Sequence, residues 1–249
     1  MQNNDQVMKN AEAFYYPGNE VGVLVIHGFT GTTQSMHSVG KQIADAGYTV
    51  YGPRLTGHGT NPEDMEQATY RDWIDDVEAG LEKVKETCSK VFVVGLSMGG
   101  ALTLYLAENH PEIAGIVPIN AAVDMGAFKQ SYNALRESGE RFVAGIGSDI
   151  KKDGVKELAY EQTPVKAMGE LVELMKIVKG DLTKIEVPAL VLSSTVDHVV
   201  PPENSQTIYK SIASEDKHIV MLENSYHVAT LDHDEPLIVS QCLTFIKTH

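Results

Sequence analysis

Short apolar segments bounded by turn residues recur along the chain, with segments of helical periodicity between them. Strands of a parallel sheet are buried on both faces, so they read as continuous runs of Val, Ile and Leu. Their alternation with helices is typical of an α/β protein. The pattern predicts a mostly parallel central sheet with helices on both faces, whose core strands lie at residues 21–28, 48–55, 90–97, 113–120, 188–194 and 217–224.

The segment between the second and third predicted strands has a helical period. In "YRDWIDDVEAGLEKVKETC" the apolar residues that share one face at 3.6-residue spacing are Trp73, Val77, Leu81 and Val84. We therefore expect a helix packed on the sheet, with Trp73 in the core.

The alternation breaks after the fourth predicted strand, where residues 121–187 hold more chain than one crossover helix needs. This predicts an insertion at about 125–181 in a single domain of residues 1–249, whose core comprises about 1–124 and 182–249. Within "AMGELVELMKIVKG" a helical apolar stripe comprises Met168, Leu171, Val172, Met175 and Val178, widened by Leu174 and Ile177. The stripe would pack on the body of the domain or line a pocket as a cap, and the two are compatible.

Composition narrows the classes of protein that remain open. The chain has 249 residues, and 20 Lys and Arg against 34 Asp and Glu give a net charge of -14. A surface of that sign repels a phosphate backbone, so nucleic acid is not an expected partner. The N-terminal "MQNNDQVMKN" has no apolar core, and no apolar run approaches the ~18 residues of a membrane span. We expect a soluble, cytoplasmic protein with no transmembrane segment.

The two cysteines offer no chemistry of their own. Cys88 and Cys242 lie far apart, in segments predicted to be helical, without the spacing of metal ligands. We expect two reduced, half-buried thiols, and no metal site or organic cofactor.

The stretch "VFVVGLSMGG" joins a predicted strand to a predicted helix through Gly95, Ser97 and Gly99. G-x-S-x-G in that context is typical of a nucleophile elbow, in which a strained turn exposes the serine Oγ. Glycines are needed on either side because a Cβ there would collide with neighbouring backbone. The amides that begin the following helix favour developing negative charge. Ser97 is therefore the predicted nucleophile.

A nucleophilic serine needs a base and an acid that orients the base, expected in the chain order Ser, Asp, His. "TVDHVVPP" places Asp197 after the fifth predicted strand, and "SYHVATLDHD" places His227 after the sixth. Together with Ser97 they form the predicted catalytic triad. The competing residues are Asp124, held as the alternative acid, and His198 and His233 beside the chosen pair.

Acyl transfer also needs N–H donors for the tetrahedral oxyanion. "IHGFTGT" leaves the first predicted strand, so the Phe29 backbone N–H can pair with that of Met98, the residue after the nucleophile. His27 is expected to form hydrogen bonds under this loop. His58, in the turn "GHGT", is expected to shape that turn and only secondarily to touch a ligand.

With "HGFTG", "GLSMGG", "DHVVPP" and "NSYHVATLD" assembled, the sequence resembles the α/β-hydrolase superfamily, and within it the small bacterial monoacylglycerol lipases and neighbouring carboxylesterases. The resemblance extends over almost the whole chain and is weakest at 125–144. It implies an α/β-hydrolase fold with a small helical cap inserted after the fold's sixth strand. It also implies a lid that admits one acyl chain, with a narrow polar end for glycerol.

The resemblance also implies three substrate contacts. Asn120 in "PINAAVD" and Glu157 in "VKELAYE" would meet the glycerol hydroxyls, and Ile146 in "GIGSD" would touch the same end. Alternatively, Glu157 is an exposed carboxylate on a helix, and Asn120 is a strand-end residue that bonds nearby backbone.

The predicted function is hydrolysis of monoacylglycerols to glycerol and fatty acid through an acyl-enzyme. The expected partner is a lipid ester, with transient contact with lipid surfaces left open. The alternatives are a broader carboxylesterase, a thioesterase or an acyltransferase, and, outside catalysis, a ligand-binding protein that keeps the fold without turnover.

Overall fold

A computed structural model describes residues 7–249. The strands are β1 (Phe14–Tyr16), β2 (Val21–Ile26), β3 (Thr49–Gly52), β4 (Lys90–Leu96), β5 (Gly115–Ile119), β6 (Phe142–Ala144), β7 (Gln162–Pro164), β8 (Ala189–Ser194) and β9 (Lys217–Leu222). The helices are α1 (Gln34–Asp45), α2 (Pro62–Gln67), α3 (Tyr70–Lys85), α4 (Met98–Asn109), α5 (Gly126–Ser138), α6 (Val165–Asp181), α7 (Glu203–Ser211) and α8 (Glu235–Thr248). Two short 3-10 helices lie at Leu182–Lys184 and Ala229–Leu231.

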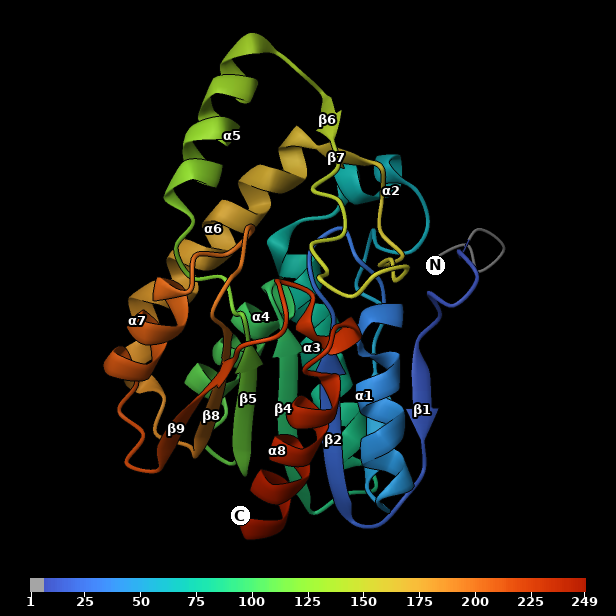
Figure 1. Cartoon of the computed structure of the whole chain (residues 1–249), viewed down its shortest axis with the longest axis vertical. Helices are drawn as coiled ribbons and strands as arrows, with labels where there is room; N and C mark the ends of the chain where they lie inside the picture. Colours follow the sequence, from blue (N-terminus) through green and yellow to red (C-terminus); the bar gives the residue numbers. More distant parts are fainter. Residues whose placement is uncertain (1–6) are drawn as a thin grey trace.

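Seven strands form the central sheet, in the order β1-β3-β2-β4-β5-β8-β9 (Figure 1). All neighbours are parallel except β1, which runs antiparallel to β3. The six predicted strands are therefore confirmed, and β1 is an edge strand that the sequence pattern did not predict. Most predicted spans run past the observed strand ends, because the residues that follow already belong to the loops of the site.

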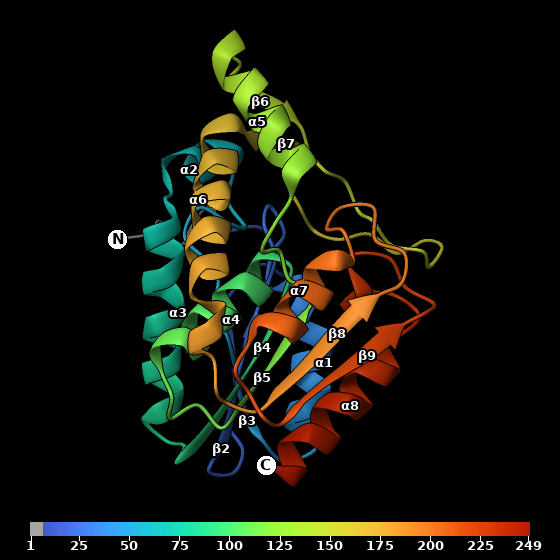
Figure 2. The same ribbon diagram turned by 90° about the vertical axis from the view of Figure 1, so that its left-hand side faces the viewer.

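The two faces of the sheet support two separate cores. Along β2, Leu24 and Ile26 pack on the side of α3 and α4, whereas Val23 and Val25 pack on the side of α1 and α8. Figure 2 shows these pairs of helices on opposite faces of the sheet. Burial on both faces explains why the strands read as continuous apolar runs.

Helix α3 forms as its sequence predicts. Thr69 and Asp72 make a capping box at its start, in which each side chain bonds the backbone N–H of the other residue. Trp73 is fully buried, as predicted, and its indole N–H donates to the Thr56 carbonyl at 3.1 Å. The other three stripe residues are also fully buried, so the stripe lies entirely in the core.

The insertion between β5 and β8 is only partly helical. It contains α5, the antiparallel pair β6 and β7, and α6, and a long loop at residues 145–161 joins the two strands. Helix α5 has no buried residue and projects from the body of the molecule (Figure 2). The insertion therefore holds the helices expected of a small cap, α5 and α6, and the short pair β6 and β7 with the loop between them adds to these helices.

The apolar stripe of α6 mostly fills the interior. Its five principal residues are buried, and the helix packs on α4, α5, α3 and α2. Leu171 also lines the cavity beside Ser97. Both expected roles of the stripe therefore occur, although packing on the body takes the larger part.

Two further expectations concern the cysteines and the membrane. Cys88 and Cys242 are free and buried rather than half-buried, and Cys88 lies just after α3 instead of within a helix. Within residues 7–249, none of the helices combines the length and apolar character that crossing a bilayer requires.

Candidate active site

Ser97 occupies a strained turn between β4 and α4. Its φ of 58° and ψ of -116° lie in a region that residues with a Cβ seldom adopt. A Cβ on Gly95 would lie 2.1 Å from the Gly99 carbonyl oxygen, and one on Gly99 would lie 2.3 Å from that of Ile26. The surrounding backbone thus requires glycine at both positions, as the sequence predicted, and it holds the serine in its turn.

Ser97, His227 and Asp197 form a hydrogen-bonded chain. His227 Nδ1 lies 2.8 Å from Asp197 Oδ2, and His227 Nε2 lies 2.9 Å from Ser97 Oγ. The ionised carboxylate can only accept, so the ring hydrogen is on Nδ1, and the Nε2 of the neutral ring accepts from the serine hydroxyl. This arrangement can remove a proton from Ser97 Oγ.

The acid is fixed by its own loop after β8. Asp197 Oδ1 accepts the backbone N–H groups of Val199 and Val200, both at 2.8 Å, which leaves Oδ2 for the histidine. Its side chain is 2% exposed. The alternative acid Asp124 is exposed and pairs with Lys179, so the structure brings Asp197 and not Asp124 to His227.

Two backbone segments adjoin the serine, one before α1 and one at the start of α4. Gly28 lies so close that a Cβ on it would come within 3.3 Å of the Ser97 Cβ, and Phe29 follows in the same loop. Met98 begins α4, and the first amides of a helix have no acceptor within the helix. The two predicted donors therefore lie on the segments that adjoin the nucleophile.

His27 and His58 contact the loop that carries Gly28 and Phe29 and hold it in place. His27 is joined through Nδ1 to the Gly28 carbonyl, and its Nε2 accepts the Leu55 N–H at 3.2 Å. Burial lowers the pKa of His27 to about 4 and that of His58 well below its usual value. Both rings are therefore neutral. His58 packs edge-on against His27 and Phe29, which agrees with the structural roles expected of both.

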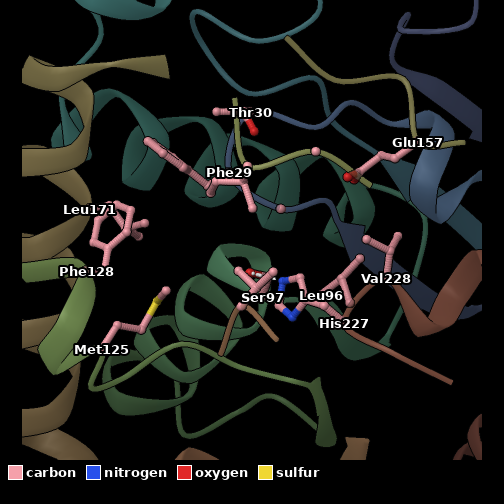
Figure 3. Close-up of a pocket in the computed structure, with 14 residues that line it drawn as sticks. Phe29, Thr30, Leu96, Ser97, Met125, Phe128, Glu157, Leu171, His227 and Val228 are labelled. Atoms are coloured by element: carbon pink, nitrogen blue, oxygen red, sulfur yellow. Dashed lines mark hydrogen bonds between the residues drawn. The ribbon is translucent and has the colours of Figure 1, made fainter. Parts of the chain in front are cut away.

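A narrow cavity opens beside Ser97 and has different chemistry at its two ends. Figure 3 shows Glu157 on one side of the serine, and Met125, Phe128 and Leu171 on the other. The free volume is about 30 Å³. The cavity thus has a polar end and an apolar end, with the hydroxyl of Ser97 between them.

Glu157 and Ile146 reach this cavity from the loop between β6 and β7. Glu157 is in that loop and not on a helix, and its carboxyl group packs against Gly31. Burial raises the pKa of Glu157 to about 7, and the neighbouring His227 and a hydrogen bond from Ser35 lower it by a smaller amount. Ile146 borders the cavity and is 42% exposed.

Asn120 does not line the cavity. Its amide nitrogen donates to Ser194 Oγ and to the His227 carbonyl oxygen, and its amide oxygen accepts the Ser194 N–H at 2.7 Å. Both amide hydrogens are thus used inside the protein. The predicted contact with glycerol is therefore corrected, because this side chain joins β5 to β8 and to the loop after β9 that carries His227, called the histidine loop below.

The sequence analysis missed Asp149. This residue of the inserted loop accepts the backbone N–H groups of His198 and His227, each at 3.1 Å. No periodicity or motif marks it. The one signal is its place three residues after Ile146 in "GIGSD", within a segment that was expected to contact substrate.

The sheet order, the serine turn and the strand-end loops define an α/β-hydrolase fold. A family described as "Serine aminopeptidase, S33" matches residues 19–234, and the chain belongs to this family of hydrolases.

Relatives of known name match over almost the full chain. This chain is 52% identical to a "Thermostable monoacylglycerol lipase" of Bacillus sp. (strain H-257), with 98% of this chain and 97% of that protein covered. It is 29% identical to a "Carboxylesterase" of Bacillus subtilis (strain 168), with 94% and 95% covered. A solved structure described under "LipS and LipT, two metagenome-derived lipolytic enzymes" superposes with a TM-score of 0.95 at 48% identity and covers 98% of this chain and 100% of that one.

Proposed function

We propose that this enzyme hydrolyses monoacylglycerols to glycerol and a free fatty acid, with Ser97 as the nucleophile. The observation that carries the proposal is the hydrogen-bonded chain from Ser97 through His227 to Asp197, which opens on a cavity with one polar and one apolar end. The names of the two curated relatives support an ester as the substrate.

The reaction proceeds in two steps through an acyl-enzyme. His227 Nε2 takes the Ser97 proton as Oγ attacks the ester carbonyl, and Asp197 stabilises the imidazolium that forms. The N–H groups of Phe29 and Met98 bind the oxyanion, and each such donor contributes ~10² to 10³ in rate. Glycerol leaves with the proton from His227. Water then attacks the acyl-enzyme by the same route and releases the fatty acid.

The polar end of the cavity suits the glycerol part of the substrate, and the apolar end suits its acyl chain. Glu157 at the polar end accepts hydrogen bonds from the free hydroxyls of glycerol, with Ile146 at the border of that end. Met125, Phe128 and Leu171 contact the acyl chain at the other end. A site that pairs its polar groups with substrate hydroxyls disfavours esters that lack them.

Admission of the acyl chain requires the apolar wall to open. Ligand pockets usually hold ≈ 300 Å³ or more, whereas this cavity has about 30 Å³. Phe128 belongs to α5, which has no buried residue. Residues 125–181 thus act as a cap, and displacement of α5 widens the apolar end.

A second candidate is a carboxylesterase of broad specificity. It is favoured by the partial exposure of Ile146, which leaves the polar end accessible to alcohols other than glycerol. In that case Glu157 would make no difference between a monoacylglycerol and a methyl ester of the same acid.

Covalent labelling and product analysis test the proposal together. A fluorophosphonate should label the wild-type protein at Ser97, and 1-monododecanoylglycerol should yield equal amounts of glycerol and dodecanoate. Ser97→Ala should abolish both, whereas Ser138→Ala, at an exposed serine of α5, should change neither. Absence of labelling in folded wild-type protein would refute the serine mechanism.

A further inference from the structure

Asp149 joins the inserted loop to both loops that hold the acid and the base. Its Oδ2 accepts the backbone N–H of His198, next to Asp197, and the backbone N–H of His227, each at 3.1 Å. Its Oδ1 lies 2.8 Å from His198 Nδ1. A single oxygen atom therefore bridges the main chains of two loops that come from different strands.

The main chain of the same residue strengthens this connection. The Asp149 carbonyl oxygen accepts the N–H of Val228 at 3.1 Å. Two successive residues of the histidine loop are thus bound to Asp149, one by its side chain and one by its backbone. The carboxylate is only 15% exposed, so water competes weakly for these bonds.

The histidine loop binds the insertion in return. Asp232 is 1% exposed, and its carboxylate accepts the backbone N–H groups of Lys151 and Lys152, at 2.7 and 2.9 Å. The same carboxylate accepts the N–H of Tyr226, the residue before His227, at 3.0 Å. Each of the two loops therefore uses an aspartate to accept backbone N–H groups of the other loop, which keeps Asp149 in place.

We propose that Asp149 is a positioning residue for the catalytic pair: its carboxylate sets the separation of the Asp197 and His227 loops. The proposal rests on the proposed function of those two residues and deepens it. Ile146 and Glu157, which border the cavity, belong to the same loop as Asp149. One inserted segment thus forms the substrate wall and aligns the base, so contacts with the alcohol can act on the geometry of the reacting groups.

Two substitutions separate positioning from mere structural support. In Asp149→Asn the amide oxygen can replace Oδ2 and keep both backbone bonds, whereas Asp149→Ala loses them. A 1 Å misplacement of a catalytic group costs about 10²-fold in rate. We expect Asp149→Ala to lower kcat by about 10- to 100-fold with KM little changed, and Asp149→Asn to recover most of that loss.

The measurement is kcat and KM on a 4-nitrophenyl ester, together with the rate of fluorophosphonate labelling and the Tm. Asp153→Ala is the matched control, because it removes an exposed carboxylate of the same loop. Labelling of Asp149→Ala should slow in parallel with kcat at temperatures well below its Tm. Labelling at the wild-type rate, or Asp149→Asn as slow as Asp149→Ala, would overturn the inference. Wild-type protein that does not label would instead refute the proposed function itself.

Discussion

The sheet and the insertion position their functional groups in different ways. Ser97, Asp197 and His227 each follow a strand of the parallel sheet, so the strand ends place them at one edge. Glu157 and Asp149 belong to a long loop, and hydrogen bonds between side chains and backbone hold that loop against the core. The sheet therefore supplies the proposed reacting groups, whereas the insertion supplies the proposed alignment of those groups and the proposed contacts with the alcohol.

The largest effect is expected from a substitution of Asp197, one of the proposed reacting groups that follow a strand of the sheet. In Asp197→Asn the amide oxygen can keep the bonds from Val199 and Val200, which leaves an NH₂ group facing His227 Nδ1. The ring must then carry its hydrogen on Nε2, the wrong tautomer for a base, and kcat should fall by about 10⁴-fold. Asp124→Asn is the control, because its carboxylate pairs with Lys179. A comparable loss in that variant would contradict the assignment of the acid.

Substitutions of two glycines test how tightly the sheet region and the insertion are packed. A Cβ on Gly99 would come within 2.3 Å of the Ile26 carbonyl oxygen, whereas one on Gly126 in α5 meets nothing within 4 Å. Gly99→Ala should lower the free energy of unfolding by about 3 kcal/mol and abolish fluorophosphonate labelling. Gly126→Ala should leave stability unchanged or raise it by up to about 1 kcal/mol. Denaturant titration measures both, and equal losses would contradict the contrast in packing.

A smaller effect is expected on the pH dependence of KM, which tests the role of Glu157 in the inserted loop. The pKa of Glu157 is raised to about 7, so the carboxyl is protonated below that pH and ionised above it. An ionised acceptor forms stronger hydrogen bonds with the glycerol hydroxyls. KM for a monoacylglycerol should therefore fall about fivefold as pH rises through 7, a difference of ~1 kcal/mol.

The control for that prediction uses the same loop. Glu157→Gln should keep the high KM of the acid side at every pH, and KM for the methyl ester should not follow the titration. Glu161→Gln, which changes an exposed carboxylate at the end of the loop, should behave as wild type. A wild-type KM that does not change through pH 7 would remove Glu157 from the alcohol site.

The sequence predicted the sheet and its strand-end residues because the burial of parallel strands leaves a direct pattern. Strand β1 was missed because it has three residues and pairs antiparallel at the sheet edge. Asn120 shows a second limit, since a polar residue at a strand end can face the site or the neighbouring strand. Asp149 shows a third, because bonds from a long loop to distant backbone depend on tertiary structure alone.

The most direct test of the division between sheet and insertion is the ratio of kcat/KM for 1-monododecanoylglycerol to that for methyl dodecanoate. The ratio should be well above one in the wild-type enzyme and should approach one in Glu157→Ala, with the rate on the methyl ester preserved. Ser97→Ala should abolish hydrolysis of both esters. A ratio that Glu157→Ala leaves unchanged, or equal losses on both esters, would contradict the proposed role of the insertion in selecting the alcohol.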